Sequence, residues 1–295
     1  MTHAAAHPLP GTLYVVATPI GNLADASPRA LDVLRQADLV ACEDTRTTRT
    51  LLARHGIGRA TLALHAHNER AATAKLLAAL RQGSSVALVT DAGTPGVSDP
   101  GALLVEAAHR EGLRVVPVPG PNAAVAAYSA AGFAADRFLF VGFLPVKAVA
   151  RRKALAALDL PWPVILYEAP HRVLATVEDL VARFGGVREL AIARELTKKF
   201  EEVARFPLAQ AVAWLKAGLH RQQGEFVLVL GPGAAAAPGL DEGERVLDVL
   251  LESLPASEAA RLAARITGAP RNALYKLALE RADQNRGKIP PVTPR

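Results

Sequence analysis

The chain has little that could cross-link it, anchor it in a membrane or hold a structural metal. Among its 295 residues there is one cysteine, Cys42, which excludes an internal disulfide and fits a reducing compartment. With so few cysteines, no metal site is expected. No apolar run reaches the roughly 20 residues of a membrane helix, and the first residues, MTHAAAHPLP, lack the pattern of a signal peptide. We therefore expect a cytoplasmic protein with no membrane partner.

What the chain does have is length, apolar content and an excess of positive charge. Hydrophobic residues make up 51% of it, and its length suits two domains rather than one. The formal net charge is +6, carried mainly by arginine, whose planar group suits phosphate recognition. A polyanionic partner is therefore favoured, although richness in arginine and alanine also follows from genome composition.

Short apolar runs alternate with helical patterns in the first part of the chain. This alternation predicts right-handed crossovers and a mostly parallel five-stranded sheet covered on both faces. Ser27, Asn68 and Asn122 each precede a helical pattern and are predicted to cap it. The predicted strands are Thr12–Ala17, Ala37–Thr45, Thr61–Ala66, Val86–Val89 and Leu113–Gly120.

A second α/β domain is predicted next, with a mixed sheet because some neighbouring strands lack long crossovers. A linker-like stretch, GPGAAAAPGLD, separates it from purely helical patterns. Ser257 is predicted to cap a helix that runs to Thr267, and a second helix is predicted from about Arg271 to Arg281. The two have helix-turn-helix spacing around Gly268, and an ordinary helical hairpin explains them equally well. The predicted divisions are a disordered start (1–10), the two α/β domains (11–131 and 132–232), a linker (233–241), a helical RNA-binding module (242–282) and a disordered tail (283–295).

The stretch VALVTDAGTPGVSDPG, Val86 to Gly101, is the strongest candidate for a ligand site. A buried strand ends there in a long loop rich in Gly, Pro, Thr, Ser and Asp, and ligands of α/β sheets bind at such carboxyl ends. Its glycines allow backbone to approach a ligand closely. The alternative, an elaborate strand-to-helix connection, needs far fewer residues.

Several motifs together carry a family resemblance that spans roughly Gly11 to Arg281. They are LYVVATPIGNLAD, EDTR, DAGTPGVSDPG, DRFLFVGFLP, YEAPHR, ARELTKKFEE, GEFVLVL and RITGAPRNALYKLAL. In this combination the chain resembles the tetrapyrrole methylase superfamily and, within it, the ribosomal RNA small subunit methyltransferase I branch. One loop reads TPIGNL instead of the GxGxGD form common in the small-molecule members, which argues against a tetrapyrrole substrate.

The resemblance implies a fold of two α/β domains with the active site in the cleft between them. It also implies methyl transfer from S-adenosylmethionine to the ribose 2′-hydroxyl of a decoding-centre cytidine in 16S rRNA, with S-adenosylhomocysteine as product. Members of the superfamily are commonly dimers, so a homodimer is expected.

The resemblance assigns cofactor contacts to motif residues of both domains. For Asn122 the alternative role is that of a helix cap, and it could have both roles. For Ala123 and Leu196 the alternative is packing in the core. The expected cofactor-binding residues are Pro19, Thr90, Asp91, Thr94, Asn122, Ala123, Glu168 and Leu196.

The transfer requires alignment in a dry cleft and a base for the hydroxyl proton. Four carboxylates are candidates for this base: Glu43, Asp44, Asp99 and Glu195. Asp99 could instead cap the helix after it, and Glu195 could pair with Arg194 or Lys198. The sequence favours none of them.

Basic residues near the predicted loop ends and in the helical module are candidates for phosphate contacts. Ordinary solvated surface charge is the alternative for each. The candidates are Arg46, Arg49, Lys147, Arg151, Arg172, Arg194, Lys198, Lys199, Arg271 and Lys276. His65 and His67 have metal-like spacing on a strand, but polar roles in the cleft are favoured over a metal.

Two other functions remain open at this point. A small substrate, such as a corrinoid or porphyrin precursor, would keep the fold and cofactor but needs neither the basic Lys147–Lys153 segment nor the helical module. A non-catalytic RNA-binding assembly factor would not need the cofactor loops.

Overall fold

The computed structural model describes residues 9–233 and 240–286. Two compact units divide the chain, one ending at Gly231 and the other beginning at Pro232. The expectations for residues 1–8, for residues 234–239 of the linker and for the tail from residue 287 lie outside the described residues.

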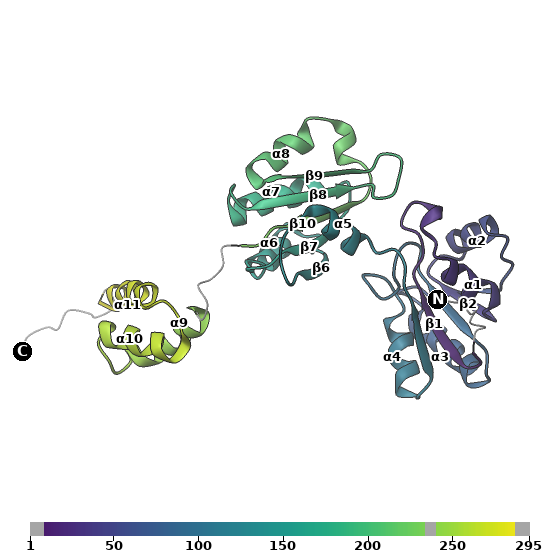
Figure 1. Cartoon of the computed structure of the whole chain (residues 1–295), viewed down its shortest axis with the longest axis horizontal. Helices are drawn as coiled ribbons and strands as arrows, with labels where there is room; N and C mark the ends of the chain where they lie inside the picture. Colours follow the sequence, from purple (N-terminus) through teal and green to yellow (C-terminus); the bar gives the residue numbers. More distant parts are fainter. Residues whose placement is uncertain (1–8, 234–239, 287–295) are drawn as a thin grey trace, which may run out of the picture. The chain divides into compact units, whose positions relative to one another are not determined.

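The first sheet has five parallel strands in the order β3-β2-β4-β1-β5. This confirms the predicted parallel sheet and places β4, which opens the candidate ligand loop, beside β1 at the centre (Figure 1). The strands are β1 (Thr12–Val16), β2 (Leu39–Cys42), β3 (Thr61–Ala63), β4 (Val86–Val89) and β5 (Arg114–Val118).

Helices cover both faces of this sheet, because successive strand residues point to opposite sides. Val40 and Cys42 pack beneath α1 and α2, whereas Ala41 packs on the other face with α3 and α4. The helices are α1 (Pro28–Gln36), α2 (Thr45–Arg54), α3 (Glu69–Arg81) and α4 (Ala102–Arg110), and a short 3-10 helix, η1, spans Leu23–Asp25.

The predicted helix caps have different outcomes. The Ser27 side chain accepts a hydrogen bond from the Ala30 amide at 3.1 Å, as predicted. Asn68 occupies the predicted N-cap position of α3, but its side chain makes no cap bond and instead accepts from the His65 amide and donates to the Ala63 carbonyl. Its amide group therefore organises the loop before α3 rather than the helix itself.

The second sheet is mixed, with the order β6-β7-β10-β8-β9. Strands β6 and β7 are parallel, and the other neighbours are antiparallel. The fully buried β10 lies at its centre, so this prediction is confirmed. The strands are β6 (Leu139–Phe143), β7 (Val164–Glu168), β8 (Glu189–Arg194), β9 (Glu202–Pro207) and β10 (Phe226–Leu230).

Helices also lie on both faces of the second sheet. Helix α5 (Ala123–Ala131) packs its alanines against Ile165, Ala191 and Val229 of this sheet. By its contacts α5 thus belongs with the second sheet, although it precedes the boundary expected after residue 131. The opposite face is covered by α6 (Ala148–Ala156), α7 (Val173–Phe184) and α8 (Leu208–Lys216), and a short 3-10 helix, η2, spans Leu219–Gln222.

The C-terminal unit consists of three helices, α9 (Leu240–Leu251), α10 (Ala256–Thr267) and α11 (Arg271–Arg286). Their shared core includes Leu247 and Leu274, and Gly268 ends α10 in the left-handed conformation, as its turn position predicts. The cap prediction for Ser257 was wrong, because α10 already begins at Ala256. No helix in the described part of the chain is long and apolar enough to cross a membrane.

A buried ion pair fastens α6 to α7. The side chains of Arg151 and Asp179 are each only 7% exposed and lie 2.7 Å apart, and Arg152 adds a second contact to Asp179 at 2.8 Å. Removing one member of a buried pair leaves the other charge without compensation.

We expect Asp179→Ala to lower the free energy of unfolding by about 3–5 kcal/mol, because it leaves Arg151 buried and unpaired. Asp32→Ala removes an exposed ion pair with Arg35 and should cost less than about 1 kcal/mol. Urea unfolding of both variants measures the difference. Equal losses would contradict the structural importance of the buried pair.

Candidate active site

Three loops at the carboxyl ends of the neighbouring strands β4, β1 and β5 are joined to one another. The Thr18 amide donates to the Gly93 carbonyl at 2.8 Å, and the Gly93 amide donates back to Thr18 at 3.1 Å. The Thr94 hydroxyl donates to the Pro121 carbonyl at 3.0 Å, which ties in the loop after β5. Gly93 has a φ of +85°, a conformation that favours glycine. The loops thus form one continuous surface.

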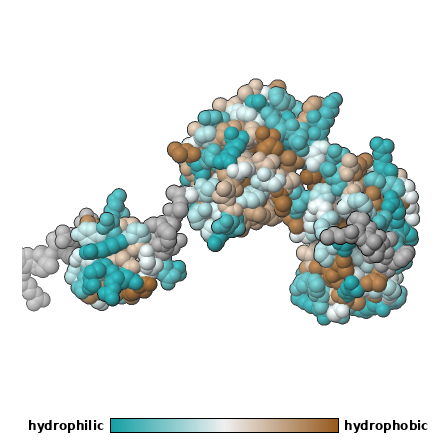
Figure 2. Space-filling model, in the orientation of Figure 1, coloured by the Kyte–Doolittle hydropathy of each residue, from teal (hydrophilic) through white to brown (hydrophobic). Residues whose placement is uncertain are grey.

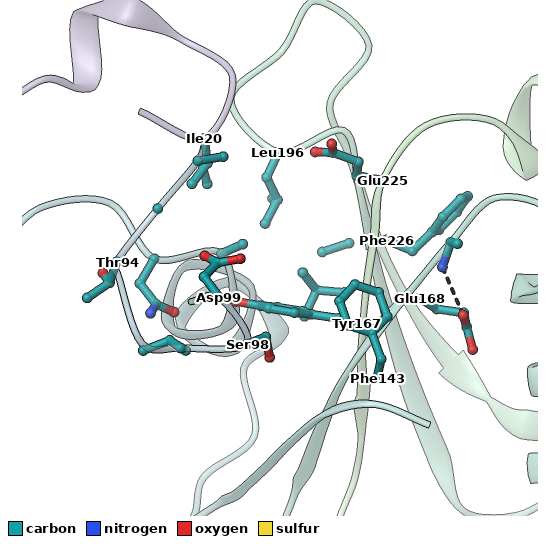
Figure 3. Close-up of a pocket in the computed structure, with 18 of the residues that line it drawn as sticks. Ile20, Thr94, Ser98, Asp99, Phe143, Tyr167, Glu168, Leu196, Glu225 and Phe226 are labelled. Carbon is teal, nitrogen blue, oxygen red and sulfur yellow. Dashed lines mark hydrogen bonds between the residues drawn. The ribbon is translucent and has the colours of Figure 1, made fainter. Parts of the chain in front are cut away.

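This surface and the second sheet enclose a pocket of about 300 Å³ (Figure 3). Its wall is mainly apolar with a few convergent polar groups, as is usual for a small-molecule site. Residues from the first sheet and α5 on the wall are Ile20, Ala92, Gly93, Thr94, Val97, Ser98, Asp99, Asn122 and Ala123. Those from the second sheet and its loops are Phe143, Tyr167, Glu168, Ala169, Pro170, Ala193, Leu196, Glu225, Phe226 and Val227.

The backbone is strained on two sides of this pocket. Ser98, Glu195 and Thr197 have φ values of +65°, +51° and +65°, and among the described residues no other non-glycine residue has a positive φ. Ser98 is on the wall, and the other two flank Leu196, which is also on the wall. Strain of this kind costs free energy and gathers at functional sites.

The structure separates the predicted cofactor residues into two groups. Thr94, Asn122, Ala123, Glu168 and Leu196 lie on the pocket wall. Thr90, Asp91 and Pro19 are not among the wall residues.

Two of the predicted cofactor residues that do not line the pocket, Thr90 and Asp91, connect the loops that do. The Thr90 carbonyl accepts a hydrogen bond from the Thr18 hydroxyl at 3.2 Å. The exposed Asp91 carboxylate accepts one from the Asp44 amide at 3.1 Å. Both bonds join loops that follow different strands of the first sheet.

Two wall residues also have structural roles. Asn122 caps α5 by accepting from the Val125 amide at 3.2 Å, as the helix-cap alternative predicted, and it also lies on the pocket wall. The Glu168 carboxylate accepts from the Thr176 hydroxyl at 2.6 Å and pairs with Arg172 at 3.1 Å. In Figure 3 it points away from Tyr167 and the pocket.

Asp99 is the one candidate base on the pocket wall. Burial, together with the nearby Glu43 carboxylate, raises the pKa of its carboxyl to about 6. The carboxylate points into the space below Ile20 and Leu196 in Figure 3. It does not cap α4, since the Gly101 amide donates to Glu69 at 2.8 Å.

The other candidate carboxylates are less suited to accept a proton in the pocket. Hydrogen bonds from the Arg46 side chain and amide lower the pKa of Asp44 to about 2. Burial acts to raise the pKa of Glu195, but hydrogen bonds from Lys198 and from the Glu225 amide hold it below its usual value. Burial and Asp91 raise the pKa of Glu43, but its side chain is not on the wall.

Three of the predicted phosphate contacts are corrected by the structure. The side chains of Arg151, Arg172 and Arg194 are 7%, 12% and 7% exposed and have partners within the fold. Arg172 also donates to the Leu144 carbonyl, and Arg194 to the carbonyls of Gln223 and Phe200. These arginines stabilise the second α/β layer and are not available to RNA.

The other predicted phosphate contacts are more accessible. Arg46 is 88% exposed beside Asp44, and Lys198 is held between Glu195 and Glu225 at 2.8 and 3.0 Å. The exposed group comprises Arg49, Lys147, Lys199, Arg271 and Lys276. Hydrophilic side chains cover much of the visible face of the C-terminal unit (Figure 2).

His65 and His67 stack edge to face, with their ring centroids 6.0 Å apart. No group of three or more histidine, cysteine, aspartate or glutamate side chains within residues 9–233 and 240–286 is placed to hold a metal ion.

Sequence reasoning did not single out the aromatic part of the pocket. Tyr167 precedes the predicted Glu168, Phe143 ends the FVGF segment, and Phe226 lies in GEFVLVL. Each lies inside a recognised motif, which is the signal that could have revealed it. Ile20 and Ser98 were missed in the same way within TPIGN and VSDPG.

Comparison with protein families agrees with this architecture. The family model of Tetrapyrrole (Corrin/Porphyrin) Methylases matches residues 12–212, and that of the RsmI C-terminal HTH domain matches residues 237–282. Among solved structures, uroporphyrin-III C-methyltransferase from Thermus thermophilus is 24% identical with a TM-score of 0.53, covering 75% of this chain and 94% of that one. A cobalt precorrin-4 methyltransferase is 18% identical with a TM-score of 0.55, covering 78% and 98%. At these identities the structures show the fold alone.

Curated relatives are much more similar. The ribosomal RNA small subunit methyltransferase I of Xylella fastidiosa (strain Temecula1) is 51% identical, covering 90% of this chain and 98% of the relative. The protein of the same name from Escherichia coli O157:H7 is 48% identical, covering 94% and 98%. The chain therefore belongs to the ribosomal RNA small subunit methyltransferase I family, within the tetrapyrrole methylases.

Proposed function

We propose that this protein methylates the ribose 2′-hydroxyl of a decoding-centre cytidine in the 16S rRNA of the small ribosomal subunit, with S-adenosylmethionine as methyl donor. The names of its relatives support the class of reaction and substrate. The observation that carries the proposal in this chain is the two-sided pocket with the Asp99 carboxylate on its wall. We also propose that the protein acts as a homodimer.

The pocket suits the proposed donor in size and chemistry. Its volume of about 300 Å³ is within the range of small-molecule sites. The apolar side chains of Ile20, Val97 and Leu196 provide surface for the adenosyl and thioether parts. Asn122 and Ala123, at the start of α5, place a helix N-terminus on the wall, which favours a carboxylate. When bound, S-adenosylmethionine supplies a methyl group on a positively charged sulfur.

The chemical contribution of the protein is then alignment, exclusion of water and acceptance of one proton. The rigidly joined loops hold reacting groups in place, which supplies much of the rate of an in-line transfer. Asp99 would take the proton of the ribose hydroxyl as its oxygen bonds to the methyl carbon. A base whose pKa lies near the working pH is best suited to this task.

The two rival functions make different demands on the chain. A corrinoid or porphyrin substrate would not need the exposed basic residues of the C-terminal unit. An assembly factor without catalysis would not need a strained pocket carrying a carboxylate of raised pKa. The likeness to tetrapyrrole-modifying enzymes is confined to the fold.

The direct test is transfer of labelled methyl from S-adenosylmethionine to purified small subunits, free 16S rRNA and porphyrin precursors. We expect labelling of the rRNA, with the methyl mapped to a ribose by nuclease resistance and mass spectrometry. Label on a base would contradict the ribose assignment, and label only on porphyrin would contradict the RNA substrate.

Asp99→Asn should lower the methylation rate by roughly 100-fold or more, the usual contribution of a general base. Asp99 accepts a proton only when ionised, so wild-type kcat/KM should rise with pH through about 6 and then level off. The variant should lose this rise. A pH profile that is unchanged in the variant would remove Asp99 from the reaction.

Stability provides the control for that variant. The pKa of Asp99 in the folded protein, about 6, lies above the usual aspartate value of about 3.9, so its contribution to stability is present below about pH 4 and is lost as the pH rises through 6. Asp99→Asn should therefore raise the free energy of unfolding at pH 8 by about 1 kcal/mol, after allowance for solvent screening of a half-exposed group. At pH 4 the two proteins should be nearly equal.

The exposed cations of α11 give a separate prediction for RNA binding. Arg271→Ala combined with Lys276→Ala should weaken binding to small-subunit rRNA and reduce the slope of log affinity against log salt by about 1 to 2. Arg29→Ala with Lys75→Ala removes the same charge from exposed positions on α1 and α3 and is the matched control. Filter binding at several salt concentrations measures both, and equal losses would contradict a specific role for α11.

A further inference from the structure

One exposed aromatic side chain lies on the pocket wall without a role in the fold or in the proposed chemistry. Phe143 is 55% exposed, although it is a large apolar residue at the end of β6. Its ring meets Tyr167 edge to face, with centroids 5.6 Å apart and an interplanar angle of 64°. In Figure 3 the two side chains lie together at one side of the pocket, next to Ser98.

A bulge in β6 places Phe143 there. The register between β6 and β7 shifts between Phe140 and Gly142, where Gly142 has a φ of +72°. In a regular strand, residues 140 and 143 would face opposite sides of the sheet. Across the bulge both rings instead contact Tyr167, Phe140 at 5.1 Å and Phe143 at 5.6 Å. Bulges near active sites commonly redirect a side chain in this way.

The same glycine brings the two walls of the pocket together. A Cβ atom at Gly142 would lie 2.7 Å from the Ser98 hydroxyl oxygen, too close for any larger residue without movement. Ser98 itself has a positive φ. A left-handed glycine and a strained serine therefore meet next to Phe143, which lies on the same pocket wall as Asp99.

We propose that Phe143, backed by Tyr167, is a stacking surface for the base of the target nucleotide and positions its ribose at the pocket. This rests on the function proposed above. Sequence-specific RNA recognition uses unstacked bases that lie flat on aromatic rings, and any base can use such a surface. The high exposure of Phe143 favours the target nucleotide, rather than the adenine of the donor, as the base that stacks on it, because an incoming RNA strand approaches from solvent.

The test replaces Phe143 by three residues and measures the substrate and the donor separately. Phe143→Ala removes the ring, Phe143→Leu keeps apolar volume without a flat surface, and Phe143→Trp restores one. Small subunits and S-adenosylmethionine are the probes, with KM and kcat from methyl transfer and donor affinity from calorimetry. Phe138→Ala, at the other end of the same segment and 40% exposed, is the matched control.

We expect the alanine and leucine variants to lose roughly 5- to 100-fold in kcat/KM for subunits, the range found for base stacking on aromatic rings. Donor affinity should stay within about twofold of wild type, the tryptophan variant should recover most of the activity, and Phe138→Ala should behave as wild type. An RNA with a fluorescent cytidine analogue at the target position should be quenched by wild type and not by Phe143→Leu.

Three results would overturn the proposal. One is full activity of the leucine variant, another is a loss of donor affinity equal to the loss in kcat/KM, and the third is equal quenching by both proteins. Failure of the proposed function looks different, because wild type itself would then transfer no methyl to subunits.

Discussion

The pair of backbone hydrogen bonds between Thr18 and Gly93 is the constraint on which the site depends. It fastens the loop after β1 to the loop after β4, and the Thr94 hydroxyl extends the connection to Pro121. Loops that follow separate strands would otherwise move independently. Joined in this way, they present glycine backbone, a helix start and one carboxylate as a single surface.

The second constraint is electrostatic. Asp99 shares its surroundings with Glu43 and Asp91, so its ionisation is opposed both by burial and by like charge. The other candidate carboxylates Asp44 and Glu195 instead form ion pairs with Arg46 and Lys198. Asp44 and Glu195 therefore stabilise the loops through their ion pairs, whereas Asp99 can exchange a proton near neutral pH. Carboxyl groups with shifted pKa values are common in active sites.

The two-sheet architecture could be predicted from the sequence because its signals are local. An apolar run predicts a strand, a cap such as Ser27 predicts the start of a helix, and the long glycine-rich loop after Val89 predicts a ligand site. The family resemblance added the wall residues Thr94, Asn122, Ala123 and Leu196, which no local pattern distinguishes from caps or core.

The parts that could not be predicted depend on partners distant in sequence. Nothing in the sequence near Arg151 indicates that it forms a buried ion pair with Asp179. The sequence alone therefore makes Arg151 a candidate for a phosphate contact. The same holds for Arg194, whose partners lie in separate loops. The bulge at Gly142 depends on pairing with β7 and on Ser98 from the other side of the pocket, so the orientation of Phe143 was not accessible from its own segment.

We propose that the joined loops and the second sheet together bind the methyl donor. A crystal structure of the protein with S-adenosylhomocysteine would test this binding site most directly. We expect density for the ligand in contact with Gly93, Asn122 and Leu196, with its sulfur on the side of the pocket open toward Asp99. Density at any other place on the protein, or a pocket filled by its own side chains while the ligand binds in solution, would contradict it.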